Sequence, residues 1–140
     1  MAHADRTLDT SASPQRVWEI WSRPQSWADW NPDVRSASLD GPLAVGTTGT
    51  LVTKQGTHRI RITTVEPERS FALEASPAPG MRMSFTCRVE PQPRGSRIGQ
   101  SVDVGGPLGS LVGGPMVKQV AASFEPILAA LKTKAEAPAG

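Results

Sequence analysis

Residues 81–90, MRMSFTCRVE, constrain the fold more than any other stretch, because their side chains alternate strictly between apolar and polar. A period of two places all the apolar side chains on one face of an extended strand. Such a strand is typical of an antiparallel sheet with one face in the core and the other in water. The face predicted to point inward consists of Met81, Met83, Phe85, Cys87 and Val89.

Weaker versions of the same pattern occur along the chain and predict further strands. Short turns separate them, such as Asp40-Gly41-Pro42 and the loop at 91–96, and short turns favour antiparallel neighbours. Two polar residues, His58 and Gln100, occupy positions on faces that the alternation predicts to be inward. The predicted strands are residues 8–12, 34–39, 47–54, 57–65, 70–75 and 97–104.

Helices are predicted on both sides of these strands. Ser13 is a favourable N-cap and Pro14 suits the first helical position, and Pro24 ends this short helix before a further turn at 25–30. A long C-terminal helix is predicted to begin in the glycine-rich segment 105–115. Its apolar stripe consists of Met116, Val120, Phe124, Ile127 and Leu131.

Pro126 lies inside this stripe and predicts a kink, because proline removes one backbone hydrogen bond from a helix. A single long helix lying over the apolar face of an antiparallel sheet is an α+β fold. The length of 140 residues predicts one domain over residues 1–140, with frayed ends near 1–5 and 135–140.

Charge and cysteine content exclude several classes of protein. The net charge of +2 does not provide the dense cationic surface that nucleic acid requires, so no nucleic-acid partner is expected. One cysteine and two histidines are too few for a Cys/His zinc site, and we expect neither a metal nor a cofactor. No stretch is long and apolar enough to cross a bilayer, so the expected location is the cytoplasm.

Three motifs resemble the START-like (SRPBCC) superfamily, and within it the polyketide cyclase/dehydrase-like group. They are ASPQRVWEIWSRPQSWADWNPDV at 12–34, PLAVGTTGT at 42–50 and ITTVEPERSFAL at 62–73. Together with the glycine-rich segment and the C-terminal helix, the likeness extends over roughly residues 6–136. The opening and middle motifs are specific to the superfamily but to no activity within it.

The resemblance implies a helix-grip fold. In this fold a curved antiparallel sheet of about six or seven strands wraps a long C-terminal helix, and two short helices follow the first strand. An internal cavity then holds a small hydrophobic molecule, which would be aromatic, polyketide-like or lipid-like. The superfamily also contains polyketide cyclases/aromatases and protein-interaction modules such as chaperone activators, so three functions stay open.

The predicted ligand-binding residues are apolar or aromatic side chains on inward faces, together with two polar ones. Tryptophans offer a large apolar face and one N–H donor, and methionines adapt to irregular ligands. Buried polar side chains need a partner, which at His58 and Gln100 could be a ligand or water. The set is Trp27, Trp30, His58, Ile60, Phe71, Met81, Met83, Phe85, Gln100, Met116 and Val120.

The residues do not decide whether the protein is an enzyme, and the catalytic residues are unknown. There is no tyrosine, so the phenolic acid that several enzymes of the superfamily use is missing. A Ser-His-Asp set would require His58, and no G-x-S-x-G motif accompanies it. Arginines at 59, 61, 82, 88 and 97 point outward and could form a weak cationic stripe, but nothing else supports a protein partner.

Overall fold

The computed structural model describes residues 2–76 and 79–137. The chain forms one seven-stranded sheet. Helical segments lie between the first and second strands and again after the last strand. The elements are β1 (Ala2–Thr10), α1 (Pro14–Trp21), the 3₁₀ turn η1 (Pro24–Ser26), α2 (Trp27–Trp30), β2 (Val34–Leu39), β3 (Thr48–Thr53), β4 (Gly56–Glu66), β5 (Ser70–Ala75), β6 (Arg82–Gln92), β7 (Gly95–Gly105), α3 (Gly109–Ala122) and α4 (Phe124–Glu136).

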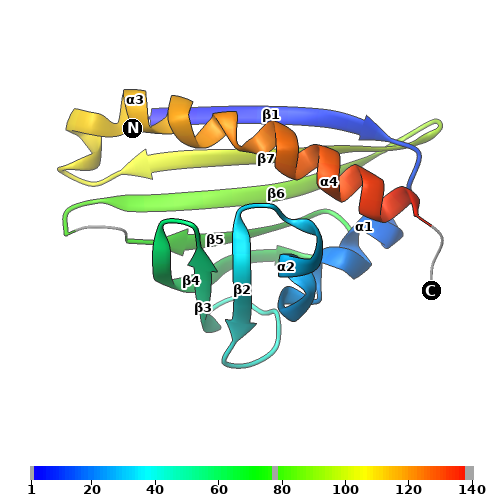
Figure 1. The fold of residues 1–140 in the computed structure, drawn as a ribbon, viewed down its shortest axis with the longest axis horizontal. Coiled ribbons are helices and arrows are strands. Elements are labelled where there is room, and N and C mark those ends of the chain that lie inside the picture. The colour runs from blue at the N-terminus through cyan, green and yellow to red at the C-terminus, as the bar shows by residue number, and fades with distance from the viewer. Residues whose placement is uncertain (1, 77–78, 138–140) are drawn as a thin grey trace.

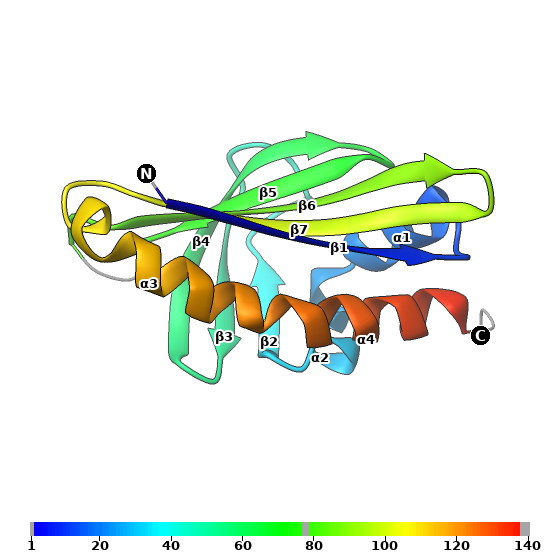
Figure 2. The same cartoon turned by 90° about the horizontal axis from the view of Figure 1, so that it is seen from above.

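All neighbouring strands are antiparallel, in the order β1-β7-β6-β5-β4-β3-β2. The first strand therefore lies beside the last one, and α3 and α4 cross the same face of the sheet (Figure 1). Strands β2, β3 and β4 turn towards the helix side, so that the sheet wraps partway around α3 and α4 (Figure 2). This arrangement confirms the predicted α+β, helix-grip fold.

The N-terminal strand is longer than predicted. We expected residues 1–5 to fray and a strand only at 8–12, but β1 begins at Ala2 and pairs with β7 through Thr10. The side chains of β1 alternate only weakly between apolar and polar. Its register is therefore set by pairing with the long strand β7. Cross-strand contacts add to this pairing, since Nδ1 of His3 lies 2.7 Å from a carboxylate oxygen of Asp103. Tertiary pairing here overrides a faint local signal.

The C-terminal end also differs from the expected fraying. Helix α4 continues to Glu136, and Ala135 is buried within the core. The carboxylate of Glu136 accepts hydrogen bonds from Thr10 Oγ1 at 2.7 Å and from the Ser11 N–H at 3.2 Å. These bonds attach the end of α4 to the end of β1. The remainder of the expected frayed end, residues 138–140, lies outside the described residues.

Helix α1 begins at the cap that the sequence predicts. The Ser13 hydroxyl accepts a hydrogen bond from the Arg16 N–H at 3.1 Å, and Pro14 is the first residue of α1. The buried face of α1 consists of Val17, Ile20 and Trp21.

The C-terminal helix is interrupted at Ser123, between α3 and α4, which confirms the predicted kink. Pro126 is the third residue of α4 and has no N–H for the preceding turn. The Ser123 hydroxyl donates a hydrogen bond to the Val120 carbonyl at 2.6 Å, so this carbonyl is paired although the helix is interrupted. The glycine-rich segment forms the turn before α3 and its first half.

The core consists of two clusters of buried side chains. The first joins α1, α2 and α4 to the sheet and includes Phe71, Val89 and Ile98. The second joins α3 and the start of α4 to β6 and β7 and includes Met83 and Val102. Both lie on the inner face of the sheet, the face that α3 and α4 cover.

Candidate functional site

The predicted ligand-binding residues gather on the inner face, apart from His58 at its edge. Within or against the first core cluster lie Trp27, Ile60 and Phe71, and within or against the second lie Met81, Met83, Met116 and Val120. Trp30 and Phe85 pack against both clusters. Gln100 is on the inner face of β7 between Ile98 and Val102, as the alternation predicted.

Trp27 and Phe71 belong to a filled part of the core. Their rings are stacked with centroids 5.6 Å apart, and the Trp21 ring meets Phe71 edge-on at 5.5 Å. The indole Nε1 of Trp27 donates to the Trp21 carbonyl at 3.1 Å, so its only donor is occupied. Here the predicted site residues provide an apolar wall and no free polar group.

The boundary between the two clusters crosses β6 and β7 at the middle of the inner face. Met83 and Val102 belong to the second cluster, and Val89 and Ile98 belong to the first. Between them, Phe85 pairs with Val102, and Cys87 pairs with Gln100. We call Trp30, Phe85, Cys87 and Gln100 the central zone.

Packing in the central zone is looser than on either side. Phe85 and Gln100 are only half-buried, although Val102 and Ile98 on the same face are fully buried. The sheet face is therefore covered less completely at these two positions than at Val102 and Ile98. Burial raises the pKa of the Cys87 thiol to about 12, so this group stays a neutral thiol and not a nucleophilic thiolate.

Trp30 carries the one buried side-chain polar atom that lacks a hydrogen-bond partner among the described residues, its Nε1. Such an atom is costly, because its hydration is lost without replacement. The Trp30 ring itself packs against both core clusters, which meet at the central zone. The sequence predicts that the Trp30 ring is part of the wall of the site, but it does not reveal that the indole N–H is unpaired.

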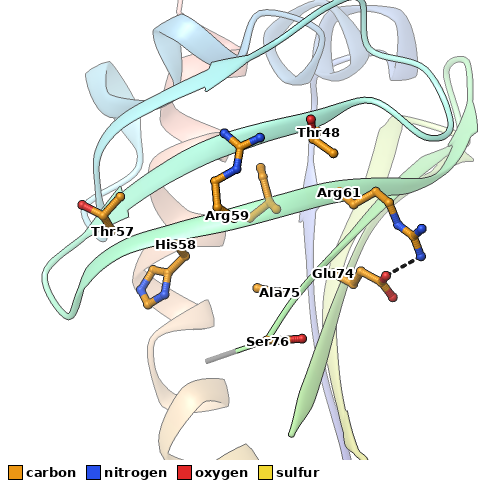
Figure 3. Close-up of a pocket in the computed structure, with 9 residues that line it drawn as sticks. Thr48, Thr57, His58, Arg59, Arg61, Glu74, Ala75 and Ser76 are labelled. Atoms are coloured by element: carbon orange, nitrogen blue, oxygen red, sulfur yellow. Dashed lines mark hydrogen bonds and ion pairs between the residues drawn. The ribbon is translucent and has the colours of Figure 1, made fainter. Parts of the chain in front are cut away.

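A pocket of about 480 Å³ lies where β4 extends beyond β5 (Figure 3). Ile60 pairs with Ala75 at the end of β5, and the first residues of β4 have β3 as their strand neighbour. His58 and Arg59 point to opposite sides of β4, and Arg61 contacts Glu74 at 2.6 Å (Figure 3). The pocket is lined by Thr48, Thr57, His58, Arg59, Ile60, Arg61, Glu74, Ala75 and Ser76.

Two of the predicted site residues, His58 and Ile60, are among the residues that line this pocket. Ile60 is buried in the first core cluster, and His58 is half-buried with its Nε2 3.4 Å from Thr53 Oγ1. Sequence analysis did not predict the pocket. The signal was the unequal length of two adjacent strands, since the predicted strand at 57–65 is longer than its neighbour at 70–75.

The outward arginines do not form a cationic stripe, because carboxylates neutralise most of them. Arg59 contacts Asp40 at 2.8 Å, and Arg88 contacts Asp5 at 2.7 Å across β7. Gly99 permits the second contact, since a Cβ there would lie 2.8 Å from Cζ of Arg88. The further pairs are Arg61 with Glu74 and Arg97 with Asp9. A partner selected by positive charge is therefore not favoured on this face.

Neither a metal site nor a membrane-spanning helix is observed in the described part of the chain. No group of three or more His, Cys, Asp or Glu side chains there is placed to hold a metal ion. None of the helices within residues 2–76 and 79–137 has the length and apolar character needed to span a membrane.

Comparison with known proteins identifies one family. A family profile described as "Polyketide cyclase / dehydrase and lipid transport" matches residues 1–136. A search of curated proteins found no match.

Solved structures share the fold at low sequence identity. The protein XoxI from Bacillus cereus is 20% identical with a TM-score of 0.76, and the match covers 96% of each chain. A START superfamily protein from Mycobacterium smegmatis is 19% identical with a TM-score of 0.72, covering 96% of this chain and 97% of the other. The di-domain ARO/CYC BexL from the BE-7585A biosynthetic pathway is 17% identical with a TM-score of 0.77, covering 99% of this chain and 51% of the other.

Proposed function

The chain belongs to the family of polyketide cyclases, dehydrases and lipid-transport proteins, and from this premise we propose that it binds a small hydrophobic molecule at the central zone. The molecule would be aromatic, polyketide-like or lipid-like. The observation that carries this proposal is the loose packing at Phe85 and Gln100, between two well-packed clusters and beside an unpartnered indole N–H. Sites for small molecules combine mostly apolar walls with a few polar groups that fix orientation.

In this proposal the apolar wall consists of residues from both layers. Met81 and Met83 lie on the sheet side and Met116 and Val120 on α3, all in or against the second core cluster. Unbranched thioether side chains adjust to ligands of different outline, which suits a wall that opens and closes around a guest. The first cluster, with Trp27, Ile60 and Phe71, forms the fixed end.

The β4–β5 pocket is proposed as the mouth of the site. Ile60 and His58 are among its lining residues, and a guest would pass beside them to reach the inner face. Its lining mixes charged, polar and apolar side chains, which is typical of a mouth and not of a hydrophobic interior. His58 is also the candidate general acid or base if the bound molecule reacts.

A filling variant tests the proposal. Phe85→Trp adds volume to the central zone, so we expect at least a tenfold loss of affinity for the neutral probe N-phenyl-1-naphthylamine, measured by equilibrium dialysis. The free energy of unfolding should change by less than about 1.5 kcal/mol, because the added atoms enter free space. Val102→Phe is the matched control in the packed zone, and there overpacking should cost about 1–3 kcal/mol.

Two results would contradict binding at this place. One is the absence of any saturable probe binding to the unmodified protein. The other is unchanged affinity in the Phe85→Trp variant. Catalytic conversion of a polyketone substrate that is lost in His58→Ala would show the protein to be a cyclase that uses the same site.

A further inference from the structure

Two tryptophans of the same short helix differ in how their N–H groups are used. Trp27 begins α2 and its Nε1 donates to the Trp21 carbonyl at 3.1 Å. Trp30 ends α2 and its Nε1 is buried without a partner among the described residues. The Trp27 N–H therefore contributes a hydrogen bond to the folded chain, whereas the Trp30 N–H has no partner among the described residues.

The contacts of the Trp30 ring oppose a rotation that would turn its N–H to water. The Asn31 N–H donates to the Trp27 carbonyl at 2.8 Å, and the Asn31 side chain accepts from the Asp33 N–H at 2.9 Å. These bonds fix the backbone at the C-terminal end of α2. Its ring also packs against both core clusters, so rotation would remove apolar contacts on each side.

Leaving an amide-like donor unpaired in the interior costs about 1–3 kcal/mol. The cost disappears when a guest supplies an acceptor, and so the empty site favours guests that have one. An indole N–H donates only, which excludes recognition of a donor group at this position.

The surroundings also restrict the charge of the guest. The buried polar side chains of the described residues are Thr10, Ser96 and Ser101, and none of them is charged. Arg6 is paired directly with Gln100 on the edge strand β1, where it is exposed and lies 3.9 Å from Glu125. A charged guest at the central zone would lose hydration, and the one charged side chain in this row of paired residues, Arg6, is exposed to solvent and lies beside Glu125.

We infer that the guest is an uncharged, largely aromatic or aliphatic molecule whose carbonyl oxygen accepts a hydrogen bond from Nε1 of Trp30. This inference rests on the proposed function and adds the chemical class of the ligand. Trp30 is thus a specificity-determining residue, which selects ketones and quinones over hydrocarbons of the same shape.

The test compares two probes of nearly the same outline. 9-Fluorenone carries a carbonyl oxygen, and fluorene has a methylene group in its place. We expect the unmodified protein to bind fluorenone about fivefold to 150-fold more tightly, the range that one hydrogen bond to a buried, otherwise unpaired donor provides. Trp30→Phe should abolish this preference, so that the affinity for fluorenone falls much more than the affinity for fluorene. Equilibrium dialysis with probe absorbance measures both affinities without depending on tryptophan fluorescence.

Trp18→Phe is the matched control, because Trp18 is partly buried at the edge of the first cluster and is not a site residue. It should leave the preference for fluorenone unchanged. A second measurement covers the case in which Trp30→Phe does not fold. In the unmodified protein, the indole ¹H resonance of Trp30 should move downfield with fluorenone and stay in place with fluorene.

The outcomes separate this inference from the proposed function. If neither probe binds, both are wrong. If both probes bind equally and the indole resonance does not respond, the site exists but the hydrogen bond to a carbonyl does not. A preference for fluorenone that persists in Trp30→Phe would assign the donor to another residue and overturn the inference.

Discussion

The two ends of α2 face parts of the interior that are packed in different ways. At Trp27, aromatic rings stack, the indole donor is used and neighbouring side chains are buried. At Trp30, the donor has no partner within the described residues, and Phe85 and Gln100 on the sheet are half-buried. This difference agrees with the proposal that the middle of the core, and not its Trp27 end, accepts a guest.

The strongest test of this comparison truncates one phenylalanine in each region. Phe71→Ala removes a ring that is 3% exposed and contacts two tryptophans, so it should lower the free energy of unfolding by about 3–5 kcal/mol. Phe85→Ala should lower it by less than about 2 kcal/mol, because the ring is already partly free of neighbours. Urea unfolding measures both values, and equal losses would remove the distinction.

Replacing the two tryptophans of α2 by phenylalanine tests the same comparison through hydrogen bonding. Trp27→Phe leaves the buried Trp21 carbonyl without its side-chain donor and should cost about 1–3 kcal/mol. Trp30→Phe removes a donor that the described residues leave unpaired, so the unliganded protein should be as stable as before or more stable. A larger loss for Trp30→Phe than for Trp27→Phe in urea unfolding would contradict this account.

Gln100→Leu examines the polar part of the central zone. The volume is nearly conserved, and the apolar side chain suits the neighbours Ile98 and Val102, so stability should stay level or rise slightly. A ligand that bonds to the carboxamide should lose about 1–3 kcal/mol of binding free energy, while apolar probes should bind as before. Calorimetric titration with both kinds of ligand would reveal this shift, and equal changes for both would count against a polar role.

The smallest expected effect lies outside the site, where α4 is attached to β1. Hydrogen bonds from Lys132, Thr10 and Ser11 lower the pKa of Glu136 to about 2 from an ordinary value of 4.5. A carboxyl with a lowered pKa stabilises the fold above pH 4.5, and this contribution is lost as the pH falls towards 2. Glu136→Gln should therefore lower the Tm slightly at pH 7 and have less effect at pH 2.5.

Most of the fold could be predicted from the sequence, because hydrophobic periodicity is a local property. The strands at 34–39 and 70–75 have the predicted bounds, and Ser13 and Pro14 mark the start of α1 as expected. Strand β1 was predicted poorly because its register depends on β7, about a hundred residues away. The neutralisation of Arg88 by Asp5 could not be predicted for the same reason.

The site could be predicted only in part. Alternation placed Phe85 and Gln100 on the inner face, but it gave no information on how well that face is filled. The unpaired donor of Trp30 depends on contacts with both core clusters, which are tertiary. The identity of Trp27 and Trp30 as indoles is a sequence property, whereas the difference between their two N–H groups appears only in the folded chain.

Methyl NMR provides the most direct test of whether the central zone accepts a guest. Met81, Met83 and Met116 belong to or pack against the second core cluster, so ¹³C-methyl labelling of methionine places probes on both walls of the proposed site. On titration with 9-fluorenone, this account predicts saturable shifts of the Met83 and Met116 methyl resonances with one common dissociation constant. Methionine resonances that stay fixed up to the solubility limit of the probe would contradict it.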